Sequence, residues 1–289
     1  MRLSSKTRPR HDPRKIYDIH ADRAAGLTPS EIAAKHDLPA TTIQGFLRST
    51  AQACALLSPY DLQRNALPAN AAVQVYWLGF IAASGRVFGQ NNLSTLVLAI
   101  HPDDAAHIQT LLQDLIIGHA TCEFADSSLD GRQVYVRDRQ LAERLLQWGI
   151  SAMPAEGSIP LEFIPRSLVS DFVRGYLEGS RHSPPFGGVR RRVPSPRSMR
   201  ALALVGHMPL IEGLSRLLQS VCGIGRGAVA PFGRTGLTQV TFSSGDSARI
   251  LEYVYRNPVR TMPRAASLAE RFVQQDGPRP RRASRNQAP

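Results

Sequence analysis

One short phrase occurs twice in this chain of 289 residues, and it limits the possible folds more than any other feature. Residues 77–85 read WLGFIAASG and residues 173–181 read VRGYLEGSR. A glycine inside a helix costs about 1 kcal/mol relative to alanine, so the glycine in each phrase needs a compensating contact. Close approach of two helices supplies that contact. The packing face that this predicts consists of Gly79, Ala82, Ala83, Gly175 and Gly179.

The segments that follow the two phrases also correspond. LIIGHATCEFADSSLDGRQV at 115–134 and VCGIGRGAVAPFGRTGLTQV at 221–240 have equal length and end on the same Gln-Val, at an offset of 106. The two phrases are offset by 96, so the second copy has gained ten residues before its next strand. This gain falls in residues 181–200, which hold six arginines and no acidic residue.

Hydrophobic periodicity predicts the same order in both copies: helix, two strands, helix, two strands, helix. The ranges expected in the first copy are 71–83, 86–88, 95–101, 102–117, 120–125, 133–137 and 139–148. Those in the second copy are 168–178, a strand near Val189, 200–205, 209–222, 228–232, 237–243 and 246–255. Alternating strands suit antiparallel sheets that have one dry face and one face free for a partner. The predicted fold class is therefore α+β.

Residues 14–50 predict a small all-α helix-turn-helix domain. Thr28 and Glu31 have the spacing of a capping box at the head of a helix over 29–36. A second helix over 40–48 follows a short turn. Its outward side chains have the chemistry for base edges and phosphates: Thr41, Thr42, Gln44 and Arg48. Helix pairs of this spacing also occur where the two helices only pack against each other and bind no DNA, so this alternative stays open.

The formal net charge of +12 is concentrated in a few segments. Residues 1–15 hold six basic residues and one acid, and residues 256–289 hold eight arginines and two acids. Together with the arginines of 181–200, this distribution favours a polyanionic partner, because phosphate contacts contribute much of the affinity of nucleic-acid-binding proteins. The alternative is a composition bias with solubilising tails, since only three of the 35 basic residues are lysine.

These features predict six parts: a basic tail 1–13, the helix-turn-helix 14–50, a linker 51–70, a first repeat 71–150, a second repeat 151–258 and a disordered basic tail 259–289. No apolar run is long enough for a membrane span, and no signal peptide is apparent. We therefore expect a cytoplasmic protein with no membrane partner, associated with the nucleoid if it is bacterial. The three cysteines lack metal-site spacing, so neither a disulfide framework nor a zinc cluster is predicted.

The duplicated phrase and the elements after it resemble the LAGLIDADG family of homing endonucleases in its single-chain, two-motif form. The resemblance covers about residues 70–255 and implies a duplicated αββαββα body with saddle-shaped antiparallel sheets. It also implies that the sheets lie along the major groove of double-stranded DNA, and that a monomer with internal pseudo-twofold symmetry suffices. In the family, the eighth motif residue of each copy is a carboxylate, and the pair holds the divalent metal ions that cleave the phosphodiester.

In this chain the eighth positions are Ser84 and Ser180, whose neutral hydroxyls cannot gather magnesium among phosphates. Glu178 stands at the sixth position, about 200° around the helix from the eighth, and its counterpart is Ala82. His182 is a further candidate ligand or base, but a loop histidine is more often solvated. We therefore expect no catalytic residue, no metal site and no cofactor. Magnesium is expected only under the alternative of an active homing endonuclease with non-family ligands.

By the same resemblance, DNA-reading side chains lie on the outward faces of the strands and in the expanded segment. The candidates are Arg86, Gln90, Asn91, Asn92, Arg132, Gln133, Arg190, Arg191, Arg192, Arg200, Arg226, Arg234 and Gln239. Arginine, glutamine and asparagine suit bidentate recognition of guanine and adenine, and other contacts neutralise phosphate.

The function predicted from these features is sequence-specific binding of double-stranded DNA by an inactive LAGLIDADG homologue, which acts as a transcriptional or mobile-element regulator. The parts are similar, in reverse order, to bacterial sporulation regulators that join a degenerate LAGLIDADG fold to a helix-turn-helix, although a fold does not determine a function. A scaffold that recruits another protein through the sheet face is a third possibility. No small-molecule substrate is evident from the sequence.

Overall fold

The computed structural model describes residues 19, 22, 27–44, 56–63, 67–90, 93–115, 121–127, 131–151, 159–180, 201–233 and 236–276. The chain divides into two compact units, Met1–Cys54 and Ala55–Pro289. We call the first the N-terminal unit and the second the body.

The N-terminal unit contains helix α2 (Pro29–His36), which starts from the capping box that the sequence predicts. The backbone N–H of Glu31 donates to Thr28 Oγ1 at 3.3 Å, and the carboxylate of Glu31 accepts from the backbone N–H of Thr28 at 2.7 Å. The helix ends at Asp37, which adopts a left-handed conformation with φ of 51°. Residues 40–44 are again helical. A small apolar core joins the helical segments, and it consists of Ile19, Ile32 and Ile43 with Leu27, Ala33 and Leu38 around them.

The first repeat of the body follows the predicted order of helices and strands. Its elements are α5 (Ala71–Ser84), β1 (Gly85–Gln90), β2 (Leu93–Ile100), η1 (Pro102–Asp104), α6 (Ala105–Asp114), β3 (Thr121–Ser127), β4 (Gly131–Arg137) and α7 (Arg139–Gln147). The four strands form an antiparallel sheet in the order β1-β2-β4-β3.

The second repeat has the corresponding elements. They are η2 (Leu161–Phe163), η3 (Arg166–Leu168), α8 (Val169–Gly179), β5 (Ala203–Gly206), α9 (Met208–Cys222), β6 (Ala228–Phe232), β7 (Leu237–Thr241) and α10 (Ser244–Tyr255). The antiparallel sheet has the order β5-β7-β6, which matches β2-β4-β3 of the first repeat. The strand expected near Val189 lies outside the described residues. The α+β fold class predicted from the sequence is confirmed.

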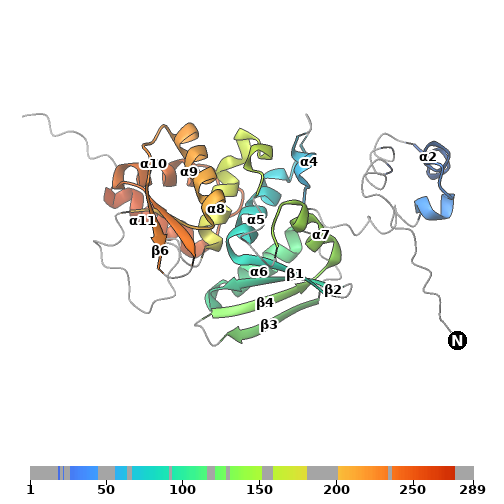
Figure 1. Ribbon diagram of the computed structural model, residues 1–289, viewed down its shortest axis with the longest axis horizontal. Helices are drawn as coiled ribbons and strands as arrows, with labels where there is room; N and C mark the ends of the chain where they lie inside the picture. Colours follow the sequence, from blue (N-terminus) through green and yellow to red (C-terminus); the bar gives the residue numbers. More distant parts are fainter. Residues whose placement is uncertain are drawn as a thin grey trace, which may run out of the picture. The chain divides into compact units, whose positions relative to one another are not determined.

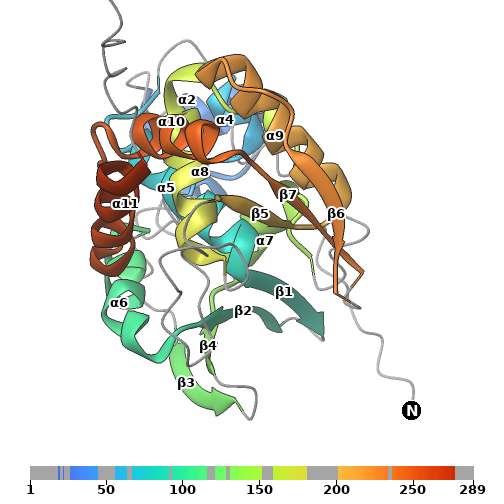
Figure 2. The same cartoon turned by 90° about the vertical axis from the view of Figure 1, so that its left-hand side faces the viewer.

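The core of the body lies between the helices and one face of each sheet. In the first sheet Leu96 pairs with Val87 on one side and with Val136 on the other, and all three are buried. Strand alternation therefore places one apolar face against the helices and leaves the other face outward. Figures 1 and 2 show α5 and α8 side by side in the middle of the body, between the two sheets.

Part of the segment expected to be a linker packs against the body. Within the range 51–70, residues 59–62 form the short helix α4 (Pro59–Leu62), and Leu56 and Leu62 are buried. The indole N–H of Trp148 donates to the carbonyl oxygen of Leu57 at 2.7 Å. These contacts fix residues 56–63 to the first repeat.

The prediction of a disordered tail from residue 259 is wrong for residues 263–276, which form helix α11 (Pro263–Asp276). Met262, Ala265, Ala269 and Phe272 are buried and recur at helical spacing. The prediction relied on the high arginine content of the segment and overlooked the helical spacing of these apolar residues. Within the described residues, no helix is long and apolar enough to cross a membrane.

Candidate nucleic-acid interface

The backbones of α5 and α8 touch where the two helices cross. A Cβ atom built on Gly79 would lie 2.1 Å from the carbonyl oxygen of Phe172, and one built on Gly175 would lie 1.9 Å from that of Tyr76. A Cβ on Gly179 would lie 2.4 Å from a third carbonyl oxygen. No side chain fits at such distances, so the three glycines that the sequence assigns to the packing face lie where only glycine allows the crossing.

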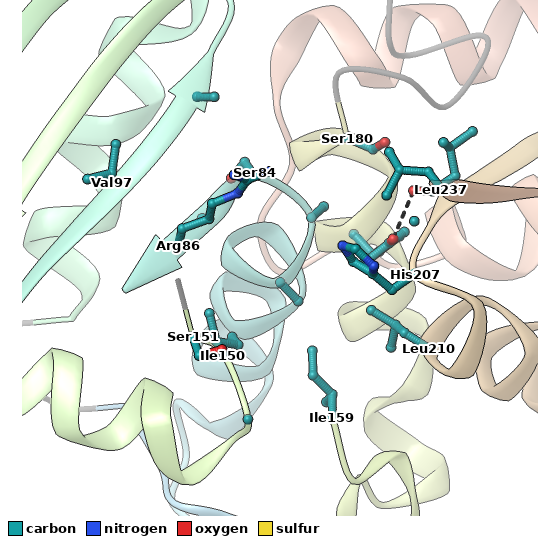
Figure 3. Close-up of a pocket in the computed structure, with 18 of the residues that line it drawn as sticks. Ser84, Arg86, Val97, Ile150, Ser151, Ile159, Ser180, His207, Leu210 and Leu237 are labelled. Atoms are coloured by element: carbon teal, nitrogen blue, oxygen red, sulfur yellow. Dashed lines mark hydrogen bonds between the residues drawn. The ribbon is translucent and has the colours of Figure 1, made fainter. Parts of the chain in front are cut away.

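Both helices end at a cavity of about 420 Å³, which we call the central cavity. Ser84 and Ser180 line it from the two helix ends, as Figure 3 shows. The Ser84 hydroxyl donates to the carbonyl oxygen of Phe80 at 2.8 Å, one turn back in its own helix. Ala82 and Ala83, which the sequence assigns to the packing face, are half-buried and also line this cavity.

Among the described residues, no acidic side chain lines the central cavity. The same part of the chain holds no group of three or more histidine, cysteine, aspartate or glutamate side chains placed to bind a metal ion. The polar groups present are the hydroxyls of serine and tyrosine, one amide, one imidazole and one guanidinium. Magnesium requires carboxylate and other oxygen ligands around a small, highly charged ion, so this donor set does not fit it.

The guanidinium belongs to Arg86 of β1, and the imidazole belongs to His207, which joins β5 to α9. Figure 3 shows Arg86 and Ser84 on one side of the cavity and His207 and Ser180 on the other. Arg86 is exposed, and it forms no ion pair with an acidic residue in the described ranges. Burial and the nearby charge of Arg86 lower the pKa of His207, so its imidazole is neutral at neutral pH.

Glu178 is not part of the central cavity but lies in a buried network on another side of α8. Its carboxylate accepts from the hydroxyls of Tyr76 at 2.6 Å and Tyr255 at 2.9 Å. It also accepts from the hydroxyl of Thr261 and the backbone N–H of Met262, each at 2.7 Å. Burial raises the pKa of Glu178, and these four hydrogen bonds oppose the rise. The carboxylate thus holds the start of the C-terminal segment against both central helices.

The same C-terminal segment carries two arginines that pair with the first repeat. Arg260 donates to both carboxylate oxygens of Asp114, at 2.6 and 2.7 Å, and Arg264 donates to Asp104 at 2.9 Å. The buried guanidinium of Arg174 donates to the carbonyl oxygen of Arg260 at 2.6 Å. Arg264 lies in the first turn of α11 and Asp104 directly precedes α6, so the starts of these two helices are joined. These arginines were counted as free tail charge in the sequence, whereas the structure uses them to join the second repeat to the first.

His107 extends the buried network from the first repeat. Its Nε2 atom lies 2.6 Å from the hydroxyl oxygen of Tyr76. Since the single hydroxyl proton of Tyr76 is donated to Glu178, the imidazole must donate through Nε2–H. Burial, followed by the positive charge of Arg260, lowers the pKa of His107 to about 4.

Because the pKa of His107 is lowered, we expect the body to lose stability on mild acidification. The pKa of His107 is about 4 in the folded protein and 6.5 in the reference state, so the unfolded chain takes up the proton first as the pH falls. Stability from the neutral imidazole is present above pH ~6.5 and is lost towards pH ~4; the loss between pH ~7.5 and ~5 is about 2 kcal/mol. Urea unfolding at the two pH values measures it. In His107→Gln, which keeps a donor for Tyr76, the difference should shrink by this amount, and an unchanged difference would contradict the assignment.

The outer face of the first sheet carries some of the predicted DNA contacts and excludes another. Arg86 aligns with Val97, which aligns with Tyr135, so all three side chains share this face. Gln133 shares it too and lines the central cavity, but its neighbour Arg132 belongs to the opposite face because successive side chains alternate. Arg132 and Gln133 therefore cannot both read a duplex from this sheet.

Two pairs of polar side chains on this face are already joined by hydrogen bonds within each pair. Arg137 donates to both oxygens of Glu123, at 2.8 and 3.1 Å, and Tyr135 donates to the side-chain oxygen of Gln133 at 2.5 Å. On the second sheet Gln239 aligns with Val205 on the cavity side.

The remaining predicted contacts are distributed as follows. Arg226 is exposed just before β6, and Gln90 ends β1. In the N-terminal unit Thr41 and Gln44 are exposed, and Thr42 is half-buried. Those outside the described residues are Arg48, Asn91, Asn92, His182, Arg190, Arg191, Arg192, Arg200 and Arg234.

Sequence reasoning missed several residues of the cavity. His207, Leu210, Ile150 and Ile159 line it, the last two from the connection between the repeats. Gly149, with φ of 75°, turns the chain after α7 and so directs this connection past the cavity. The apolar residues carry no chemical signal, and only the topology brings them together.

No protein-family model and no curated protein matches the sequence. Among solved structures, the homing endonuclease I-DmoI in complex with DNA and Ca is 14% identical with a TM-score of 0.50, over 69% of this chain and 97% of that chain. Mesophilic variants of I-DmoI are 14% identical with a TM-score of 0.48, over 65% and 98% of the two chains. Full-length WhiA from Thermatoga maritima is 16% identical with a TM-score of 0.44, over 75% and 64%. At these identities the likeness bears on the fold alone: the chain has a LAGLIDADG-like fold, similar to that of I-DmoI.

Proposed function

We propose that this chain is a sequence-specific double-stranded DNA-binding protein whose body holds the duplex without cutting it, in the role of a transcriptional or mobile-element regulator. The observation that carries this proposal is the chemistry where the two central helices end. Ser84 and Ser180 line the central cavity as neutral hydroxyls, Arg86 has no acidic partner in the described ranges, and the described lining offers no carboxylate. Such a surface attracts phosphate but does not collect the metal ions that cleavage needs.

The fold supports a DNA partner, because I-DmoI has been solved in complex with DNA. Much of the affinity is then supplied by arginines beyond the sheets, since Arg137 is neutralised within the face and Arg260 and Arg264 are neutralised within the body. The segments with unbalanced charge are 1–15, 181–200 and the four arginines of 277–289. They would make phosphate contacts, while Gln133 and Gln239 face the groove between the sheets.

The N-terminal unit is proposed to act as a helix-turn-helix that reads a second part of the same site. Thr41 and Gln44 are exposed on the helix that follows α2, and Ile43 between them anchors that helix in the small core. Two linked modules gain affinity through effective concentration when both reach one duplex. The repeat supplies two similar halves, so we propose that a monomer binds, in the cytoplasm.

Affinity for duplex DNA measured against salt tests the proposal. We expect the logarithm of the binding constant to fall linearly with the logarithm of salt concentration, with a slope of about −0.9 for each phosphate neutralised. Selection from random duplexes should then yield one preferred sequence. A flat salt response, or no binding, would favour the protein-recruiting scaffold instead.

The absence of cleavage needs a separate test. A nicking assay with magnesium and manganese on the selected duplex should show no product from the unchanged chain. Joint substitution of Ser84→Asp and Ser180→Asp should create metal binding at the helix ends, measurable by titration calorimetry. Metal-dependent breaks made by the unchanged chain would support the endonuclease alternative.

A further inference from the structure

The central cavity presents about as much apolar as polar surface, and a duplex phosphate would contact only the polar part. Both sheets contribute, and so do the connection between the repeats and the first turn of α9. The apolar side chains are Ala82, Ala83, Phe88, Val97, Ala99, Ile150, Ile159, Val205, Leu210 and Leu237. Its volume of about 420 Å³ is that of a small-molecule site, and such sites combine apolar walls with a few polar groups that fix orientation.

The labelled apolar and polar side chains are only partly separated, since Ser151 lies beside Ile150 and Leu237 lies near Ser180. In the view of Figure 3, Ile150, Ile159 and Leu210 gather at the lower end, away from Ser84 and Ser180. The polar end has Arg86 on one wall and His207 on the other. A molecule that satisfies both ends needs an apolar body and one polar head.

The charge of the polar end selects the head group. Arg86 is the only charged side chain of the described lining, since the imidazole of His207 is neutral at neutral pH. A single guanidinium matches one carboxylate, to which it can donate two parallel hydrogen bonds. The neutral imidazole of His207 can donate one further hydrogen bond to the same oxygens through its single N–H.

We propose that the central cavity binds a small monoanion with an apolar body, namely a medium-chain aliphatic carboxylate or an aromatic carboxylate. The carboxylate pairs with Arg86 and accepts from His207, and the body lies among Ile150, Ile159 and Leu210. A duplex phosphate could neutralise Arg86, but it would leave these apolar walls without a partner. The occupant would stand between the two sheets, so it would compete with a duplex bound there, although binding of the carboxylate itself does not depend on the proposed DNA function.

The test uses the full chain and three probes of matched length: octanoate, octanol and octylamine. Titration calorimetry should show binding of octanoate, with octanol and octylamine at least about tenfold weaker. Of the three probes, only octanoate carries a negative charge that can pair with the guanidinium of Arg86. Arg86→Gln should weaken octanoate at least about tenfold and leave octanol unchanged. The matched control is Arg249→Gln, which alters an exposed arginine on α10, away from the cavity, and should not change octanoate affinity.

A second variant tests the apolar end. Leu210→Gln should weaken octanoate while acetate, which has no apolar body, stays equally weak in both proteins. Equal affinities for octanoate and octanol, or an octanoate affinity that survives Arg86→Gln, would overturn the proposal. A final arm adds octanoate to the DNA complex and should raise the apparent dissociation constant of the duplex. If the chain binds no DNA at all, the calorimetric result still decides the carboxylate site.

Discussion

Replacing Gly175 with alanine should strongly destabilise the body, because its Cβ would make the shortest contact found among the described glycines. The new Cβ would lie 1.9 Å from the carbonyl oxygen of Tyr76 and 2.8 Å from the backbone nitrogen of Phe80. Both neighbours are backbone atoms of α5, so no side chain can turn away and the two helices must separate. Overpacking costs about 1–3 kcal/mol where side chains can yield. We expect a loss on the order of 4 kcal/mol here, against a gain of about 1 kcal/mol from helix propensity.

Urea unfolding followed by tryptophan fluorescence measures this loss in the body alone, because both tryptophans, Trp77 and Trp148, are buried there. Gly245→Ala is the matched control: this glycine lies in the first turn of α10, and a Cβ on it would meet nothing within 4 Å. That variant should gain up to about 1 kcal/mol. Equal effects of the two substitutions would mean that the helix crossing is not as close as described.

The sequence predicts this crossing because a glycine in a helix is a local cost that only a distant contact explains. Gly79 and Gly175 occupy the same place in a repeated phrase, so each one identifies the other as its partner. The limits of the helices could also be predicted, because capping residues and hydrophobic periodicity are local properties of the sequence. Helix 29–36 with its capping residue Thr28 was predicted residue by residue.

The C-terminal segment shows what such reasoning cannot reach. Arg260 and Arg264 are unremarkable members of an arginine-rich stretch until the fold brings Asp114 and Asp104 to them across about half the chain. A charge count treats each arginine as free, because the carboxylate that neutralises it has no signature in the sequence. The cavity has the same limit: its apolar wall is built from segments that only the completed topology places together.

The second large effect is expected at Glu178. Alanine at this position removes the acceptor of four hydrogen bonds, from the buried Tyr76 and Met262 and from the half-buried Tyr255 and Thr261. Each buried donor without an acceptor costs about 1–3 kcal/mol, reduced where water enters the space. We expect Glu178→Ala to lower the free energy of unfolding by on the order of 4 kcal/mol. The segment that begins α11 should also become sensitive to proteases, because the carboxylate holds it to α8.

Glu178→Gln separates this structural role from a catalytic one. Its amide keeps one oxygen acceptor but places a donor against donors, so we expect about half the loss of the alanine variant. Glu252→Gln serves as the control, because that exposed carboxylate meets Arg256 only at 3.8 Å, and its loss should stay within about 0.5 kcal/mol. The order expected in urea unfolding is Ala below Gln below the unchanged chain. A glutamine variant as stable as the unchanged chain, but lacking a metal-dependent nicking activity that the unchanged chain possesses, would instead make Glu178 a catalytic carboxylate.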